Sequence, residues 1–176
     1  MRYTPLAAAV ALCLCATSSM ILGAPRAEAP LNPLSLQMQA AGDQARAASQ
    51  WSAAIDAYES ALVADPRNAG ALIGLGDVAR AQNLPGKAIG YYDDALLIRP
   101  DTAAALAGLG EAYVARGAID RARDTLAQLQ RVCGGDGCAE IATLTGAIHA
   151  AGEQTAMRPE AVMPRPSVEF ASPGNH

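Results

Sequence analysis

Aromatic side chains are scarce in this sequence. Phe, Trp and Tyr make up 4% of the 176 residues, whereas 51% of the residues are hydrophobic, so alanine and leucine must form most of the core. Such small side chains suit closely packed helices. They suit neither a β-sandwich nor an aromatic platform on which nucleic-acid bases stack. The length allows one ordinary domain.

Strong charge of either sign is also missing. The formal net charge is −4, and no run of like charges stands out. A general binder of nucleic acids or of anionic membranes needs a basic face. The composition therefore argues against both of these functions.

Residues that carry catalysis are few as well, and histidine occurs only twice. Residues 84–88 (LPGKA) resemble the end of a phosphate-binding loop, but Ala81 stands where that loop requires glycine and Ala88 where it requires Ser or Thr. Asp93 and Asp94 are adjacent, and adjacent residues of a helix point in different directions, so we interpret them as part of a solvated face. We therefore expect no enzyme activity, no cofactor and no metal site.

The N-terminal segment, residues 1–23, has the pattern of a secretory signal. Arg2 gives a positive start, residues 6–16 (LAAAVALCLCA) form a continuous apolar run, and small residues follow at Ser19 and Gly23. This order of features is typical of a cleaved signal peptide. We predict a signal peptide over residues 1–23.

Two alternatives to cleavage stay open. Residues 5–24 are about long enough to span a bilayer, which would keep the segment as an anchor. Lipidation at Cys13 or Cys15 would make the chain a lipoprotein, although leucine precedes each cysteine where such signals have Gly, Ala or Ser. Every alternative places the rest of the chain outside the cytoplasm, and we expect it in the periplasm. Residues 24–34 are rich in proline and are expected to be a linker.

A sequence pattern then recurs with a period of 34 residues. The pattern LxxLG at Leu72 recurs at Leu106 and, more faintly, as MxxAG at Met38, and AxxxYxxAxxxxP at Ala88 recurs at Ala54. A period of this size indicates stacked units, none of which can bury its apolar face alone.

Turn residues divide each unit into two helices. Pro66 and Pro100 end the second helices of the first two units, because proline cannot continue the hydrogen-bond ladder and disfavours helix in the residue before it. In the second unit, Pro85 is suited to the first position of a helix. In the third, Gly117 can adopt the left-handed conformation that ends one.

Residues 35–136 resemble three tandem tetratricopeptide repeats, a family with the pattern W-x2-L-G-x2-Y…A-x3-F…P. Trp is absent from the first pattern position, and Gly134 replaces the final proline. The resemblance implies an all-α solenoid in which small residues allow close helix crossings. It also implies that Tyr58, Tyr92 and Leu126 fill the gaps toward the next unit. The expected organisation is three repeats over 35–68, 69–102 and 103–136, a capping helix over 137–151 and a disordered proline-rich tail over 152–176.

The capping helix would cover the apolar surface of the last repeat. Ile141, Leu144 and Ile148 lie at helical spacing, and Gly152 is expected to stop the helix. Four prolines follow in residues 157–176, which argues against a packed element there. A short binding segment, or a segment that folds back into the groove described below, is the alternative for residues 157–170.

Cys133 and Cys138 flank a loop with three glycines. In an exported protein such a pair indicates a disulfide, which we expect to fix the capping helix and to stabilise it by about 2 kcal/mol at most. A redox site and a metal site are the alternatives. The spacing is not that of a thioredoxin-type pair, and two thiolates form only half of a structural zinc site.

The family resemblance further implies a concave groove, lined by the first helix of each repeat, that binds an extended peptide or a helix. The family positions carried over to this sequence are Gln39, Asp43, Arg46, Ile73, Asp77, Arg80, Ala107, Glu111 and Arg116. The pairs Asp43–Arg46 and Asp77–Arg80 could simply neutralise each other, or the acids could select a basic partner segment. Chaperone-binding relatives clamp a terminal carboxylate with Lys and Asn at positions where this chain has Gln39 and Asp43, so we expect no such clamp.

These features predict a non-enzymatic adaptor that binds a peptide or helix of a partner protein, in the assembly of pili or secretion machinery in a bacterial envelope. The alternative is an accessory scaffold subunit of an envelope enzyme system, such as cytochrome c maturation or cell-wall synthesis. We expect a membrane contact only through an uncleaved or lipidated N-terminus, and no nucleic-acid partner.

Overall fold

A computed structural model describes residues 29–134 and 137–156. Within these residues the chain forms seven α-helices and no strand, so the predicted all-α class is confirmed. The helices are α1 (Pro33–Ala47), α2 (Trp51–Ala64), α3 (Ala69–Ala81), α4 (Pro85–Ile98), α5 (Ala103–Ala115), α6 (Ile119–Val132) and α7 (Ala139–Ala156). The predicted signal segment, residues 24–28 of the predicted linker and the tail from residue 157 lie outside the described residues.

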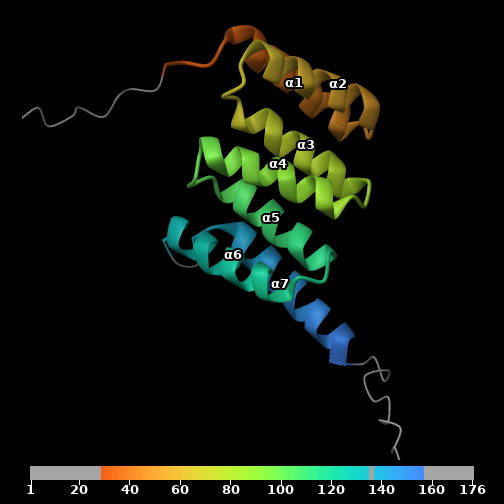
Figure 1. Cartoon of the computed structure of the whole chain (residues 1–176), viewed down its shortest axis with the longest axis vertical. Coiled ribbons are helices and arrows are strands. Elements are labelled where there is room, and N and C mark those ends of the chain that lie inside the picture. The colour runs from red at the N-terminus through yellow and green to blue at the C-terminus, as the bar shows by residue number, and fades with distance from the viewer. Residues whose placement is uncertain (1–28, 135–136, 157–176) are drawn as a thin grey trace, which may run out of the picture. The chain divides into compact units, whose positions relative to one another are not determined.

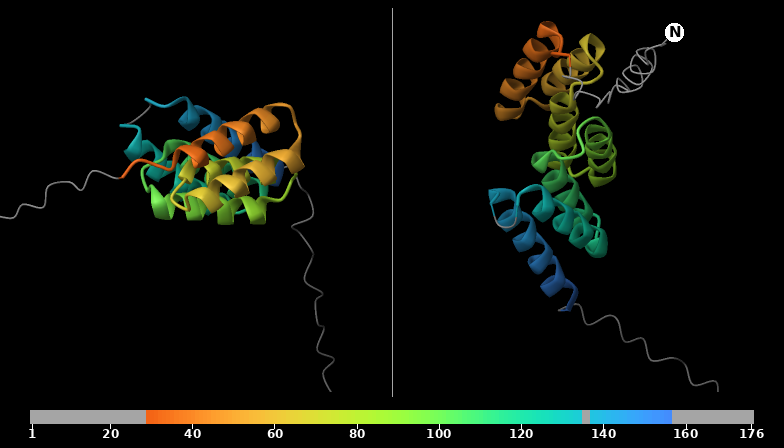
Figure 2. Two further views of the ribbon diagram at one scale, coloured as in Figure 1. Left: turned by 90° about the horizontal axis from the view of Figure 1, so that it is seen from above. Right: turned by 90° about the vertical axis from the view of Figure 1, so that its left-hand side faces the viewer.

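Consecutive helices pair as hairpins, and the pairs stack on one another (Figure 1). α1 packs on α2, α3 on α4, and α5 on α6. Contacts between pairs join α1 to α3, α3 to α5, and α5 to α7, which also packs on α6. The right-hand view of Figure 2 shows the same succession. α7 therefore occupies the place that the first helix of a fourth repeat would take.

The turn inside each hairpin uses the same backbone conformation at the same repeat position. Ser49, Asn83 and Gly117 have positive φ values of 57°, 57° and 79°, and the second helix begins two residues later in every case. Glycine adopts this region without steric cost, and asparagine does so more readily than most residues. The prediction for Gly117 is confirmed, and the structure extends it to the two non-glycine positions.

α1 begins at Pro33, earlier than the expected start at Ser35. The Asn32 side chain caps the helix by accepting a 2.9 Å hydrogen bond from the Leu34 N–H, as N-cap residues do. Ser35 is fully buried; its hydroxyl donates to the Ala61 carbonyl (2.8 Å) and accepts from the Asn68 amide (2.9 Å). The Asn68 side chain also caps α3. These bonds tie the first hairpin to the second.

Asp65 accepts several hydrogen bonds at the end of the first repeat. It lies just after α2 and is only 5% exposed. Its carboxylate accepts hydrogen bonds from the Arg67 side chain (2.9 and 3.1 Å) and from the backbone N–H groups of Asn32 and Arg67 (3.0 Å each). In that order of effect, these donors lower the pKa of Asp65 to about 2.

Tyrosine rings fill the joints between repeats. Tyr58 and Tyr92 are fully buried. A Cβ atom added at Gly42 or Gly74 would lie 2.6 or 2.3 Å from the Tyr58 ring, so both glycines face that ring directly. Tyr92 lies in the same way between Gly76 and Gly108. Because the helices carry no side chain at these points, the rings can pack against the backbone itself.

At the third joint the prediction for Leu126 is wrong. A Cβ at Gly110 would meet Leu144 of α7 at 2.5 Å, whereas Leu126 is only partly buried at the edge of this cluster. The reason is that α7 crosses α5 directly and brings its own side chain to the glycine. Leu144 is fully buried, and the neighbouring Ile141 and Ile148 are 6% and 7% exposed.

α7 continues to Ala156, so the expected end at Gly152 is also wrong. A Cβ at Gly152 would meet nothing within 4 Å. An exposed glycine costs a helix only about 1 kcal/mol relative to alanine, and the residues that follow it are compatible with helix. Residues 152–156, predicted to begin the tail, belong to α7. None of the described helices is both long and apolar enough to cross a bilayer.

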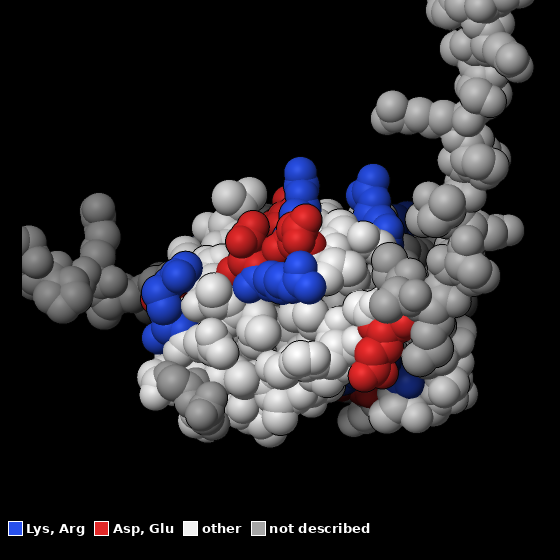
Figure 3. Space-filling view, turned by 90° about the horizontal axis from the view of Figure 1, so that it is seen from below, with Lys and Arg blue, Asp and Glu red and all other residues white. Residues whose placement is uncertain are grey.

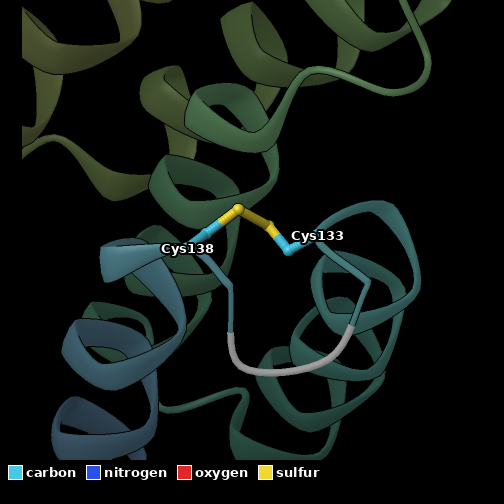
Figure 4. Close-up of a disulfide and its surroundings, with 2 residues drawn as sticks. All are labelled: Cys133 and Cys138. Carbon is cyan, nitrogen blue, oxygen red and sulfur yellow. A yellow bond between two sulfur atoms is a disulfide. The ribbon is translucent and has the colours of Figure 1, made fainter.

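A disulfide joins the end of α6 to the start of α7. Cys133 is the C-terminal capping residue of α6, and Cys138 directly precedes α7. Their Cα atoms lie 5.7 Å apart, and Figure 4 shows the bond bridging the two helix ends. Both cysteines pack against the cluster that holds Leu144. The link therefore fixes α7 at the end where it leaves the third repeat.

Candidate functional site

A groove of about 640 Å³ runs along the first helices of the hairpins. α1, α2, α3, α5 and α7 all contribute to its lining. The lining residues are Arg46, Trp51, Asp77, Arg80, Ala81, Glu111, Val114, Ala115, Thr143 and Ala147. One part of the lining is charged, and the rest is made of small or apolar side chains.

The charged part begins at the first repeat. The Tyr58 hydroxyl donates a 2.8 Å hydrogen bond to Asp43, and the Arg46 Nε donates to the same hydroxyl at 3.2 Å. The direct Asp43–Arg46 contact is longer, at 3.9 Å. The predicted pair within the repeat thus exists, but the tyrosine mediates most of it.

Arg46 also reaches the next repeat. Its guanidinium lies 3.4 Å from the carboxylate of Asp77, which accepts a 2.7 Å hydrogen bond from the Tyr92 hydroxyl. Arg80 does not pair with Asp77 as predicted; it forms an ion pair with Glu111 on α5. The alternative in which Asp77 and Arg80 neutralise each other is wrong, because each arginine extends toward the acid of the following repeat.

The result is a row of five charges, which we call the charge row: Asp43, Arg46, Asp77, Arg80 and Glu111. Acid and base alternate along it, and it begins and ends with an acid. The side chains of the row are between 23% and 46% exposed. Ion pairs between side chains this exposed contribute little to the stability of the fold. Their main effect is to fix the direction in which each side chain points.

The two tyrosines that donate to acids of the charge row are held in their neutral form. Burial, and then the hydrogen bond to Asp43, raise the pKa of Tyr58 to about 12. Burial and the Asp77 carboxylate raise the pKa of Tyr92 well above its usual range. Both hydroxyls therefore remain hydrogen-bond donors at any physiological pH.

The third repeat lacks both the arginine and the tyrosine that accompany the acid in the first two repeats. Val114 stands at the position of Arg46 and Arg80, and Leu126 at the position of the two tyrosines. Glu111 consequently has one bonded partner among the described residues, Arg80. The Nε of Arg80 is buried without an acceptor in hydrogen-bond geometry, unlike that of Arg46.

Several residues predicted to line the groove do not line it. Asp43, which begins the charge row, is not among the lining residues. Ala107 is 5% exposed and belongs to the core. Ile73 is half-buried and packs against core clusters on both sides. The amide of Gln39 lies against Gly70, at the contact between α1 and α3. Arg116 is the exposed capping residue at the end of α5.

The groove includes three residues that sequence reasoning missed: Trp51, Thr143 and Ala147. Trp51 begins α2, and its half-exposed ring is the sole tryptophan of the chain, a signal that could have marked it. Thr143 and Ala147 lie one turn apart on α7. Their role depends on α7 packing like the first helix of a further repeat, which the repeat pattern itself does not encode.

The described residues offer no evident reactive centre. They contain no group of three or more His, Cys, Asp or Glu side chains arranged to hold a metal ion. Asp93 and Asp94 are exposed on α4. On the face shown in Figure 3, acidic and basic side chains lie in small mixed groups, and most of the visible surface is uncharged.

Comparison with known proteins agrees with this architecture. Two models of the tetratricopeptide repeat family match, one at residues 40–101 and the other at residues 79–148. Together they cover more than half of the chain. No curated protein matches it by sequence.

Solved structures share the fold. The tetratricopeptide repeat domain of Sgt2 from Aspergillus fumigatus has 24% identity and a TM-score of 0.66, covering 85% of this chain and 97% of that one. The first such domain of Spaghetti (RPAP3), bound to the HSP90 peptide SRMEEVD, has 15% identity and a TM-score of 0.63, covering 72% and 99%. The TPR2B domain of yeast Sti1, in complex with pHsp70, has 16% identity and a TM-score of 0.63, covering 68% and 97%. The described helices are therefore tetratricopeptide repeats, and the chain is a tetratricopeptide-repeat protein.

Proposed function

We propose that this protein is a non-enzymatic interaction module whose groove binds an extended peptide or a helix of a partner protein. The observation that carries the proposal is the groove of about 640 Å³ with a charged part and an apolar part. Clefts of this kind, with a few fixed polar groups, suit ligand binding. Domains of the same fold have been solved with peptides of HSP90 and HSP70 bound.

The peptide bound here would differ from those chaperone tails. Gln39 and Asp43 occupy the positions where chaperone-binding relatives place the Lys and Asn of their carboxylate clamp. Gln39 packs against Gly70, and Asp43 accepts the Tyr58 hydroxyl. An acid at this position would repel a terminal carboxylate, so we propose no chaperone-tail clamp.

The setting that we propose is the bacterial envelope, with the module facing the periplasm. The signal-like pattern of residues 1–23 supports export, with a retained anchor or a lipidated cysteine as the alternatives. Cys133 and Cys138 are bonded to each other, which suits an oxidising compartment. The leading role is an adaptor in pilus or secretion assembly. The second is a scaffold subunit of an envelope enzyme system.

Filling the groove tests the proposal. Ala115 is an exposed groove residue at the end of α5, so Ala115→Trp should occupy the groove without disturbing the core. Ala127→Trp, at an exposed position of α6 outside the groove lining, is the matched control. Partners that co-purify from a membrane fraction with the wild type and the control, and are lost with Ala115→Trp, would support groove binding.

The identity of those partners separates the two roles. Pilus or secretion components would support the adaptor, and enzyme subunits would support the scaffold. If Ala115→Trp retains every partner of the wild type, binding takes place outside the groove and the proposal fails.

A further inference from the structure

Glu111, the last acid of the charge row, has no bonded partner in its own repeat among the described residues. Asp43 and Asp77 each accept a tyrosine hydroxyl, at 2.8 and 2.7 Å. Glu111 has no such donor, because Leu126 replaces the tyrosine. Three carboxylates face two guanidinium groups along the row, so one negative charge has no counterpart within it.

The Glu111 carboxylate has a single bonded partner. Arg80 contacts its Oε2, and no other described residue bonds to the carboxylate. A carboxylate can accept several hydrogen bonds through its two oxygens. A single guanidinium nitrogen therefore does not saturate it.

Glu111 is also the least exposed acid of the row. The side-chain exposure falls from 46% at Asp43 to 27% at Asp77 and 23% at Glu111. An acceptor that is partly removed from water and lacks a partner costs free energy. The acceptor capacity that Arg80 leaves unfilled therefore lies at the less exposed end of the row, whereas Asp43 is more exposed to water.

The surroundings of Glu111 favour a cation that is linked to apolar groups. Val114, Ala115 and Ala147 line the same end of the groove, and Thr143 adds one hydroxyl. None of these side chains is charged, and an ion pair strengthens where water is displaced by such groups. A lysine or arginine has this combination, since its apolar stem can lie on small side chains while its charged head reaches an acid.

We propose that Glu111 binds a lysine or arginine side chain of the partner segment, which thereby completes the alternation of the charge row. The inference rests on the proposed function, since it names the partner chemistry of the same groove. The bound segment places small or apolar residues against Val114, Ala115 and Ala147. Glu111 thus determines specificity for a basic residue at one position of the segment.

Peptide selection tests the inference without knowledge of the partner. A phage-displayed library of random dodecapeptides is selected on the full-length protein, and binders that also recognise Ala115→Trp are discarded. The remaining groove-dependent peptides should share a Lys or Arg beside small apolar residues. Each is then synthesised with that residue and with norleucine, an uncharged side chain of similar length.

The expected result is about tenfold weaker binding of the norleucine peptide, the usual effect of losing one hydrogen bond to a charged group. Glu111→Gln should abolish this difference, and Glu111→Asp should retain part of it. Asp94→Asn, at an exposed position of α4 outside the groove lining, should leave the difference unchanged. Thermal unfolding of each variant shows whether the fold is intact.

Four outcomes would overturn the inference. Groove-dependent peptides without enriched Lys or Arg, or a lysine preference that persists in Glu111→Gln, would contradict it and leave the proposed function standing. The absence of any groove-dependent peptide would contradict both. Tighter peptide binding by Arg158→Gln/Arg165→Gln would show that the chain's own arginines compete for the groove, and the cation would then come from this chain and not from a partner.

Discussion

The joint between the second and third repeats and the joint between the third repeat and α7 solve the same packing problem differently. Tyr92 fills the first joint with an aromatic ring that packs against Gly76 and Gly108. Leu144 fills the second by packing on Gly110, and the Cys133–Cys138 bond fastens the helix that carries it.

This difference links packing to recognition. The tyrosine that seals a repeat joint also donates its hydroxyl to an acid of the groove, as Tyr92 does to Asp77. In the third repeat Leu126, which has no hydroxyl, stands at the tyrosine position. Glu111 therefore lacks the donor that the earlier acids have, and the charge row differs chemically at its two ends.

The largest expected effect compares two glycines of α5. A Cβ at Gly108 would lie 2.4 Å from Cζ of the Tyr92 ring, and one at Gly110 would lie 2.5 Å from Cδ2 of Leu144. A buried ring cannot move aside, whereas the end of a leucine can rotate. Gly108→Ala should lower the free energy of unfolding by about 2–3 kcal/mol and Gly110→Ala by about 1 kcal/mol.

Urea denaturation measures both changes. Gly90→Ala on α4 is the matched control, because a Cβ there meets nothing within 4 Å, and it should raise the free energy of unfolding by about 0.5–1 kcal/mol. Equal costs at Gly108 and Gly110 would show that the two joints are equally rigid, and the comparison would no longer hold.

Removing the disulfide should have a smaller, local effect. Closing so short a loop stabilises the folded chain by about 2 kcal/mol, so Cys133→Ser/Cys138→Ser should lose about that much. Because the bond fixes the start of α7, hydrogen exchange should quicken there first, and peptide binding should weaken as Thr143 and Ala147 become less well placed. Exchange that quickens equally in α1 and α7 would contradict a local role for the bond.

The smallest expected effect is the pH dependence of the stability that Asp65 contributes at the opposite end of the array. Asp65 and Cys133 occupy the same position of the first and third repeats, two periods apart. The hydrogen bonds from Arg67 and Asn32 lower the pKa of Asp65 from its ordinary value of 3.8 to about 2. Its stabilising contribution is therefore present above pH 4 and is lost as the pH falls toward 2.

Denaturation at several pH values checks this expectation. Asp65→Asn should be less stable than the wild type at neutral pH, and the difference should narrow between pH 4 and pH 2. Asp101→Asn, at an exposed position outside the ion pairs observed in the described residues, should show no comparable narrowing. A difference that is constant with pH would mean that the ionised carboxylate of Asp65 does not fasten the end of the first repeat.

Much of the fold could be predicted from the sequence. The stops at Pro66 and Pro100 and the turn at Gly117 depend on local backbone sterics, which are the same in any tertiary context. The positive φ at Ser49 and Asn83 could have been inferred from the period, since both align with Gly117. The end of α7 could not be predicted, because a single exposed glycine shifts the balance between helix and coil too little to end a helix.

The groove was predictable only in part. Arg46, Asp77, Arg80 and Glu111 line it as expected, because they recur on one face of the first helices. Ala107 was assigned to the groove and lies in the core, since small residues at a helix crossing occupy similar sequence positions whether they face the groove or the next helix.

The sequence by itself determined the period, the helix boundaries set by proline and glycine, and the composition of small residues that allows close crossings. The helix boundaries depend on interactions within a few residues of the chain, and the period and the composition can be read from the sequence directly. Only the tertiary structure decided that arginines pair with the acid of the following repeat, that Leu144 replaces a tyrosine at the last joint, and that α7 forms part of the groove. These features depend on the distance and rotation between neighbouring helices, which no residue specifies alone.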